Sequence, residues 1–271
     1  MRRILLPLLL GLALFLSACK SSPPVASSLP PTPTPTPSAT ASNPATPTPL
    51  PTQPIPAPRF GALTDSFRQT LPDKPDVVLV EGDLSLPYIE NADGVPPYAA
   101  INRWYEQLME GLKSDLADSV SQAKDDYETS QALGDVFSGY SSEHIFEVMY
   151  QTDTTLGVLR TNYGFSGGPY PTLLYMADRF DMTTGIFLSF ADFFTDAAKA
   201  EEIIRAEVIR QAAGFPDYNQ DAVASAFNRE SFYPTADGLV FFYQPQTLNP
   251  QAGTKPEFQV PYRMLEGLLS R

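Results

Sequence analysis

The sequence contains one cysteine, one histidine and one tryptophan, and these scarcities remove several kinds of chemistry. Because Cys19 is the only cysteine, the chain forms no internal disulfide, and the folded region has no thiol nucleophile. One histidine without a second cysteine does not make a zinc site, and no glycine-rich phosphate loop precedes a predicted helix. We therefore expect no metal and no other cofactor.

Basic residues are also scarce. The chain has 18 Lys and Arg residues against 31 Asp and Glu residues, and its formal charge is −13. The charge becomes more negative when Arg2 and Arg3 are removed with the export signal described below. A charge of this size keeps a domain in solution and repels nucleic acid and anionic lipid. We expect no nucleic-acid partner and a preference for cationic partners.

The first 20 residues have the pattern of an export signal. Arg2 and Arg3 precede an apolar run over residues 4–16, and small residues precede Cys19. The run is shorter than the roughly 20 residues that a membrane span needs. The Leu-Ser-Ala-Cys ending resembles a bacterial lipobox, which implies a signal peptide over residues 1–18 and a lipid on Cys19. That lipid would hold the chain at the outer face of the cytoplasmic membrane. The alternative is an ordinary cleaved signal in which Cys19 is incidental.

Residues 19–59 have the composition of a tether. Pro, Thr, Ser and Ala dominate this stretch, which has almost no charged or aromatic side chain, so it cannot bury apolar surface and should stay disordered. Its proline content predicts a stiff spacer, which at about 3.1 Å per residue reaches up to ~120 Å. O-glycans on the threonines and a role as ligand of a proline-binding module are alternatives.

The region after residue 76 has the patterns of a folded domain. Apolar residues recur at three- and four-residue steps from Tyr98 to Tyr127, which predicts a long amphipathic helix that begins near Pro97. We expect Trp104 to pack in the core; stacking on a ligand is the alternative. Runs rich in β-branched and aromatic residues, bounded by Gly, Pro and Asp, predict strands. We expect strands at 76–86, 135–151, 157–165, 170–180, 185–188, 232–235, 238–244 and 258–260, and further helices at 197–213, 221–227 and 261–269.

The predicted strands follow one another instead of alternating with helices. This order favours an α+β fold, with a mostly antiparallel sheet packed with two to three amphipathic helices after the disordered tether.

Two sets of motifs carry a resemblance to known extracytoplasmic domains. The first set is the strand Leu86-Pro87-Tyr88-Ile89 followed by Ala100-Ile101-Asn102 at the start of the helix. Residues 76–152 thereby resemble a DUF4163-like domain, which also occurs beside some peptidoglycan deacetylases. The deacetylase chemistry belongs to a separate catalytic domain, which we do not expect here.

The second set lies in residues 153–271 and follows the order of a DUF3298-like domain. It comprises Ser166-Gly167-Gly168, Phe180-Asp181, Thr184-Gly185, Asp192-Phe193-Phe194, Asp237-Gly238-Leu239-Val240-Phe241 and Pro261-Tyr262. In this respect the chain resembles the family of the lysozyme-sensing anti-sigma factor. The resemblance implies a domain whose loops contact a cationic enzyme. We expect no cytoplasmic anti-sigma segment ahead of the signal peptide. The sequence leaves open whether the two domains share one sheet.

Two loops of the resemblance differ from the family pattern. Pro169-Tyr170-Pro171 follows the Gly-Gly pair where Ala-His is common, and the loop Pro250-Gln251-Ala252-Gly253 is one residue shorter and lacks a tyrosine. Aromatic residues near a turn can stack on sugar or anchor a protein partner. The candidate ligand-binding residues are Ser166, Gly167, Gly168, Tyr170, Pro250 and Gln251. An ordinary hairpin turn is the alternative reading of the Gly-Gly-Pro run.

These observations predict a non-enzymatic surface lipoprotein. Its expected ligand at the cell envelope is a protein or glycan, either a cationic protein such as lysozyme or a part of peptidoglycan. His144 lies in a predicted strand, where a structural or solvent-facing role is favoured over catalysis, and no nucleophile-elbow motif is present. The alternatives are an envelope enzyme that acts on cell-wall polymer through paired carboxylates, and a purely structural spacer.

Overall fold

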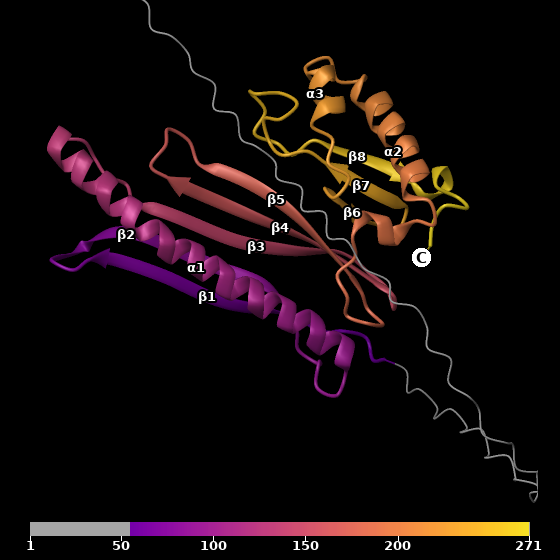
Figure 1. The fold of residues 1–271 in the computed structure, drawn as a ribbon, viewed down its shortest axis with the longest axis horizontal. Helices are drawn as coiled ribbons and strands as arrows, with labels where there is room; N and C mark the ends of the chain where they lie inside the picture. Colours follow the sequence, from indigo (N-terminus) through magenta and orange to yellow (C-terminus); the bar gives the residue numbers. More distant parts are fainter. Residues whose placement is uncertain (1–54, 271) are drawn as a thin grey trace, which may run out of the picture. The chain divides into compact units, whose positions relative to one another are not determined.

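The computed structural model describes residues 55–270, which Figure 1 shows in colour. The predicted signal peptide, the lipid site at Cys19 and nearly all of the predicted tether lie outside the described residues. Within residues 55–270, none of the helices combines the length and the apolar composition that crossing a membrane requires. The described region contains helices and mostly antiparallel strands, which confirms the predicted α+β fold.

The first sheet has five strands in the order β1-β2-β3-β4-β5. All neighbouring strands are antiparallel except β2 and β3. These two are parallel, and a long helix makes the crossover connection that a parallel pair needs. The sheet continues through residues 152 and 153, where the sequence predicts the division between two domains, so both predicted domains contribute strands to it. The strands are β1 (Phe60–Leu71), β2 (Lys74–Ile89), β3 (Tyr140–Gln151), β4 (Thr155–Ser166) and β5 (Thr172–Asp181).

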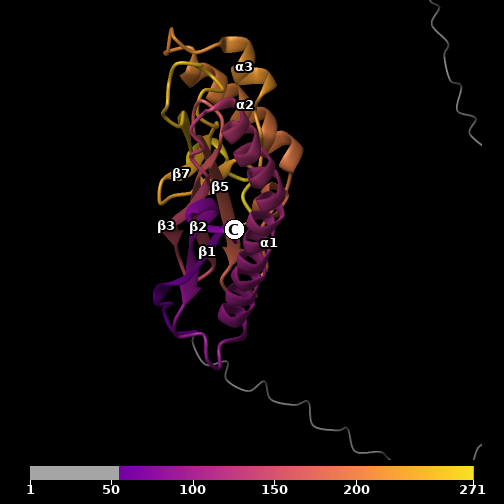
Figure 2. The ribbon, with the colours of Figure 1, turned by 90° about the vertical axis from the view of Figure 1, so that its left-hand side faces the viewer.

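Helix α1 (Pro96–Leu133) is the connection between β2 and β3, and it packs on β2 and β1. Proline in its first turn supplies a fixed φ where no backbone donor is needed, and Gly134 ends it with φ 75° in the left-handed region. The predicted helix is confirmed and extends to Leu133. Figure 2 shows it on one side of β1, β2 and β3. Trp104 packs against the core between α1 and the sheet, as predicted.

The parallel pairing of β2 and β3 covers only Val80–Leu84 and Tyr140–His144, after which the strands separate. A side chain from α1 then takes the place of a neighbouring strand. Asn102 is 4% exposed; its Oδ1 accepts from Ile89 N at 2.8 Å, and its Nδ2 donates to Ile89 O at 2.9 Å. Because an unpaired buried backbone group destabilises the fold, Asn102 stabilises the open edge of β2.

The C-terminal part forms a second sheet of three antiparallel strands, in the order β6-β7-β8. One face of this sheet packs on α2 through residues such as Phe241 and Val208, and the other face packs on β3–β5 through Val240, Phe242 and Leu159. The layers are therefore α1, the five-stranded sheet, the three-stranded sheet and α2. The elements are the 3-10 helix η1 (Phe190–Phe193), α2 (Ala197–Ala212), α3 (Gln220–Ser225), β6 (Phe232–Pro234), β7 (Gly238–Phe242), β8 (Glu257–Pro261) and the 3-10 helix η2 (Tyr262–Met264).

Two predicted elements are wrong. Residues 185–188 are not a strand but make one isolated bridge, between Phe187 and Phe180. Residues 261–269 are not a helix: after η2, Gly267 has φ 78°, which a helix does not allow, and Leu269 instead bridges to Phe194. Strand β1 was missed, since the tether was predicted to end at residue 59 and no element was assigned before residue 76.

Candidate functional site

The β4–β5 turn carries four of the predicted ligand-binding residues. Ser166 is the last residue of β4, and Gly167 has φ 79°, a conformation that favours glycine in a tight turn. The turn is exposed throughout, and the side chain of Tyr170 is 81% exposed. The hairpin therefore presents an uncovered tyrosine on a loop supported by two paired strands.

This turn lies against the C-terminal part of α1, where acidic side chains gather. A Cβ placed on Gly167 would lie 3.9 Å from Asp126 Oδ2. Tyr140 donates a hydrogen bond to the same oxygen at 2.6 Å, and this bond, together with one from Gln122, holds the pKa of Asp126 below its usual value. Asp126 is therefore ionised at neutral pH. The last turn of α1 has no basic residue, so the negative end of the helix dipole adds to this field.

Pro250 and Gln251 lie in the loop between β7 and β8, and the first residues of that segment are held on the first sheet. Gln244 Oε1 accepts from Tyr175 N at 2.9 Å, and Gln244 Nε2 donates to Tyr175 O at 2.7 Å. The side chain thereby pairs with the free edge of β5 as another strand would. Within the loop, Asn249 Oδ1 accepts from Gln251 N at 2.9 Å.

The other end of the loop is held by Lys255. Its Nζ lies 4.8 Å from the ring centre of Tyr175 and 5.3 Å from those of Tyr233 and Phe242, and it forms an ion pair with Glu257 at 2.5 Å. Three aromatic faces and one carboxylate satisfy an ammonium group that is almost removed from water. The loop that carries Pro250 and Gln251 is therefore fixed at both ends to the β5 side of the first sheet.

The two predicted loops lie toward the same end of the strands in Figure 1. Each of them is positioned by its own contacts, and the hydrogen bonds of residues 55–270 include none between the two loops. The structure thus places the predicted residues on one side of the molecule as two separate surfaces.

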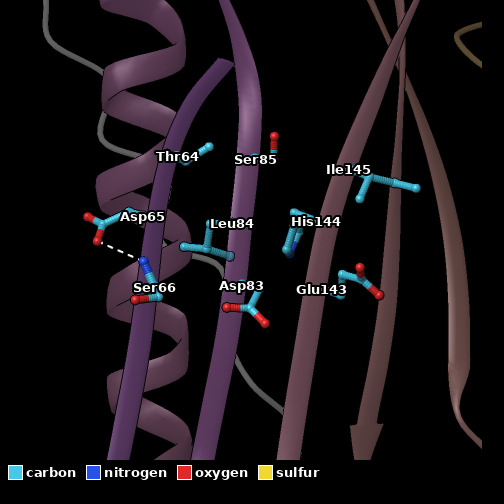
Figure 3. Close-up of a pocket in the computed structure, with 9 residues that line it drawn as sticks. All are labelled: Thr64, Asp65, Ser66, Asp83, Leu84, Ser85, Glu143, His144 and Ile145. Carbon is cyan, nitrogen blue, oxygen red and sulfur yellow. Dashed lines mark hydrogen bonds between the residues drawn. The ribbon is translucent and has the colours of Figure 1, made fainter.

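A shallow hollow on the face of the first sheet away from α1 contains a pair of carboxylates (Figure 3). Asp83 and Glu143 occupy paired positions on β2 and β3, and both are exposed. Ser66, Ser85 and Ile145 line the same hollow. This pair is a candidate for the paired carboxylates of the alternative hypothesis.

His144 follows Glu143 on β3 but is buried, with 5% of its surface exposed. Its Nδ1 has no hydrogen-bond partner among the described residues. Burial, with the nearby positive charge of Arg160, lowers the pKa of His144 to about 4, so the ring is neutral at physiological pH. This position fits the structural role favoured from the sequence. Among the described residues, no group of three or more His, Cys, Asp or Glu side chains is arranged to hold a metal ion.

A buried polar network between α1 and β4–β5 was not predicted from the sequence. Arg160 Nε and Nη2 donate to the two carboxylate oxygens of Asp178 at 2.6 and 3.1 Å, and Tyr105 donates to Asp178 Oδ2 at 3.2 Å. Burial and the charge of Asp178 raise the pKa of Tyr105 well above its usual value, so its hydroxyl stays protonated. These residues are far apart in sequence, and no local pattern indicates their contact.

Comparison with known proteins supports part of the resemblance. Residues 191–263 match the family described as "Protein of unknown function (DUF3298)". A solved structure of a DUF3298 member from Bacteroides fragilis NCTC 9343 is similar, with a TM-score of 0.58 and 15% identity; the match covers 79% of this chain and 94% of that one. A DUF3298 family protein from Pseudomonas aeruginosa PAO1 has a TM-score of 0.55 and 20% identity, over 79% of this chain and 95% of that one. No curated protein matches the chain.

These findings define the class of the protein as an α+β chain with a DUF3298 region over residues 191–263. At these identities the two solved structures show a shared fold. The DUF4163-like first half and the likeness to the lysozyme sensor stay predictions.

Proposed function

We propose that this protein is a non-enzymatic binding protein of the bacterial cell envelope. In this proposal a lipid on Cys19 anchors it outside the cytoplasmic membrane, residues 19–59 extend it from the surface, and the folded domain binds a cationic protein, of which lysozyme is the test case. Support for the anchor comes from the signal-like first 18 residues and the Leu-Ser-Ala-Cys ending. Support for the ligand comes from the charge and the geometry of the β4–β5 turn.

One observation carries the proposal: the exposed Tyr170 lies on a turn that packs beside an ionised carboxylate of α1. Exposed aromatic side chains act as anchors in protein interfaces, and a field of one sign steers a partner of the opposite sign. The turn joins two paired strands, so little conformational freedom is lost when a partner binds. Asp126 and the C-terminal end of α1 supply the negative field.

The paired-carboxylate enzyme is less well supported. Asp83 and Glu143 are both exposed, and Figure 3 shows them on the neighbouring strands β2 and β3. A glycosidase acid needs an apolar surrounding to hold its proton near neutral pH, while its partner stays ionised. An exposed pair without such a difference in surroundings favours binding over hydrolysis.

The test is a calorimetric titration of the full chain with lysozyme, with an acidic protein of similar size as the control partner. We expect micromolar or tighter binding that weakens with salt. Tyr170→Ala should weaken it about tenfold or more. Ile186→Ala should not, because Ile186 is an exposed apolar residue beside the opposite end of α1, where Gly185 contacts Pro97.

Three other outcomes would contradict the proposal. Lack of lysozyme binding at micromolar concentration would exclude a cationic protein of this kind as the ligand. Binding of purified muropeptides instead would assign the site to a glycan. Muropeptide turnover that is lost in Asp83→Asn or Glu143→Gln would establish the enzyme.

A further inference from the structure

A groove lies beside α1, on the same face of the first sheet, over the part of that face that α1 does not cover. It has a volume of about 370 Å³ and is lined by residues of α1, β3, β4 and β5. Its apolar lining includes Leu116 of α1 and Leu174 of β5, and Leu174 is 41% exposed. Below we call this the α1–β5 groove. It ends near the β4–β5 turn, since Phe165 lines both this groove and the adjoining hollow beside Gly167 and Asp126.

The charge of the α1–β5 groove has one sign. Asp115 lines it, and none of the residues within 55–270 that line it is lysine or arginine. The ion pairs and hydrogen bonds of the described region include none to Asp115, whereas Lys113, two residues before it on α1, is already paired with Asp65 and Glu110. Asp115 is therefore available to a cation from outside the molecule.

Two polar side chains at the base of the groove have unused hydrogen-bonding capacity. Ser142 Oγ donates to Asn162 Oδ1 at 3.0 Å, which leaves the amide group of Asn162 without a partner in the described region. His144 also lines the groove, is 5% exposed, and has an unpartnered Nδ1. An amide donor between apolar side chains is suited to the carbonyl groups of an extended peptide.

We propose that the α1–β5 groove binds an extended segment of the cationic partner, in which an apolar side chain lies next to lysine or arginine. The inference rests on the proposed function and adds the part of the partner that is recognised. In this arrangement the apolar side chain packs between Leu116 and Leu174, the Asn162 amide donates to a backbone carbonyl, and the basic side chain pairs with Asp115.

Gly164 allows the groove to be blocked without disturbing the fold. It lies on β4 in the lining, and a Cβ placed on it would meet nothing within 4 Å. Gly164→Leu should therefore fold normally and fill the space. Gly111→Leu is the matched control, because Gly111 also has nothing within 4 Å but is exposed on α1 and does not line the groove. Thermal melting of both variants checks the fold.

Asp115→Lys and Asp118→Lys test the charge in the same way. Both are exposed acids on α1, and only Asp115 lines the groove. We expect Gly164→Leu and Asp115→Lys each to weaken lysozyme binding about tenfold or more, with both controls within about twofold of the wild type. Equal binding by Gly164→Leu and the wild type would show that the groove is not the binding site, and it would leave the proposed function intact.

A second probe separates the two hypotheses when lysozyme does not bind. The peptide acetyl-Lys-Leu-Lys-amide, added at about millimolar concentration to the full chain, should shift the NMR signals of the Asn162 side chain and of His144, and acetyl-Glu-Leu-Glu-amide should not. These shifts should be absent in Gly164→Leu. If neither peptide shifts them, the groove is not a peptide site; if muropeptides alone shift them, the groove is a glycan site and the inference is wrong.

Discussion

Arg179 joins the two sheets, and its replacement by methionine tests how much of the stability depends on that junction. The side chain is 1% exposed and extends from β5 toward β6. Its Nη1 donates to the carbonyl oxygens of Glu230 and Phe232 at 2.9 and 2.8 Å, and its Nε donates to Leu188 O at 3.2 Å. Nη2 pairs with the Glu230 carboxylate at 2.9 Å, and the guanidinium lies 4.2 Å from the ring centre of Phe232.

Two opposing effects determine the size of the change. Methionine keeps an apolar stem of similar length but leaves two or three carbonyl groups without a donor, at about 1–3 kcal/mol for each buried group. Against this, the folded protein no longer has to bury a charge; that burial is the main reason that the pKa of Arg179 is lowered to about 10. The lost bonds dominate, because the carbonyl oxygens of Phe232 and Leu188 lose their donor inside the protein, whereas the Glu230 carboxylate is 42% exposed and can be hydrated. We expect Arg179→Met to lower the free energy of unfolding by about 3 kcal/mol, and Tm by about 6–12 °C.

Urea unfolding of the full chain, followed by circular dichroism, measures this difference. Arg229→Met is the matched control, because the Arg229 side chain is 52% exposed in its pairs with Glu201 and Glu230, and its loss should cost less than about 1 kcal/mol. Combining Arg179→Met with Glu230→Gln should cost less than the sum of the two single changes, since one partner is already missing. A change below about 0.5 kcal/mol for Arg179→Met would contradict this prediction and show that the carbonyl groups find other donors.

The remaining predictions concern buried polar groups. The pKa of His144 is near 6.5 in the unfolded chain and about 4 in the folded chain. The free energy of unfolding of the wild type therefore has its full value above pH 6.5 and falls by up to about 3 kcal/mol as the pH is lowered toward 4. The difference in urea stability between the wild type and His144→Leu should change with pH in that window; a constant difference would contradict the assignment. Asn102→Ala should lower stability by about 2–4 kcal/mol, because both backbone groups of Ile89 lose their partner. Lys255→Met should lower the free energy of unfolding by about 1–2 kcal/mol and increase proteolysis of the β7–β8 loop. Unchanged cleavage would show that Gln244 alone holds this loop on β5.

Much of the fold could be predicted, because local patterns specify it. Apolar spacing and proline determine where α1 begins, and turn residues separate β3, β4 and β5 near the predicted positions. Strand β1 escaped detection because Asp65, Ser66 and Arg68 interrupt its apolar residues, and an edge strand with one exposed face does not need a continuous apolar run. The prediction of a last helix was wrong because the apolar residues after Pro261 fit a helix as well as they fit an irregular segment when the tertiary contacts are unknown.

The candidate site was only partly predictable. The exposure of the β4–β5 turn follows from its Gly and Pro residues, and the sequence identified Tyr170 there. Asp126, which lies beside Gly167 of the same turn, could not be identified, because this proximity depends on the length of α1 and on the register of β3 with β4. The junction at Arg179 and the network of Arg160 with Asp178 are likewise contacts between distant segments, for which one sequence contains no signal.

The order of the strands explains why the α1–β5 groove exists. A helix that connects two parallel neighbours lies on one face of their sheet, and on that face α1 packs on β2 and β1. The β4–β5 hairpin joins the sheet beyond β3, so its inner face extends past the helix. Nearest the core, the charges of Arg160 and Asp178 neutralise each other on that face. Farther out on the same face lie Gly164 and Asn162, and neither is the large apolar residue that packing against a covering helix would require. If the uncovered face served only as solvent-exposed surface, Gly164→Leu would change stability slightly and binding not at all, so this variant separates a by-product of the topology from a binding site.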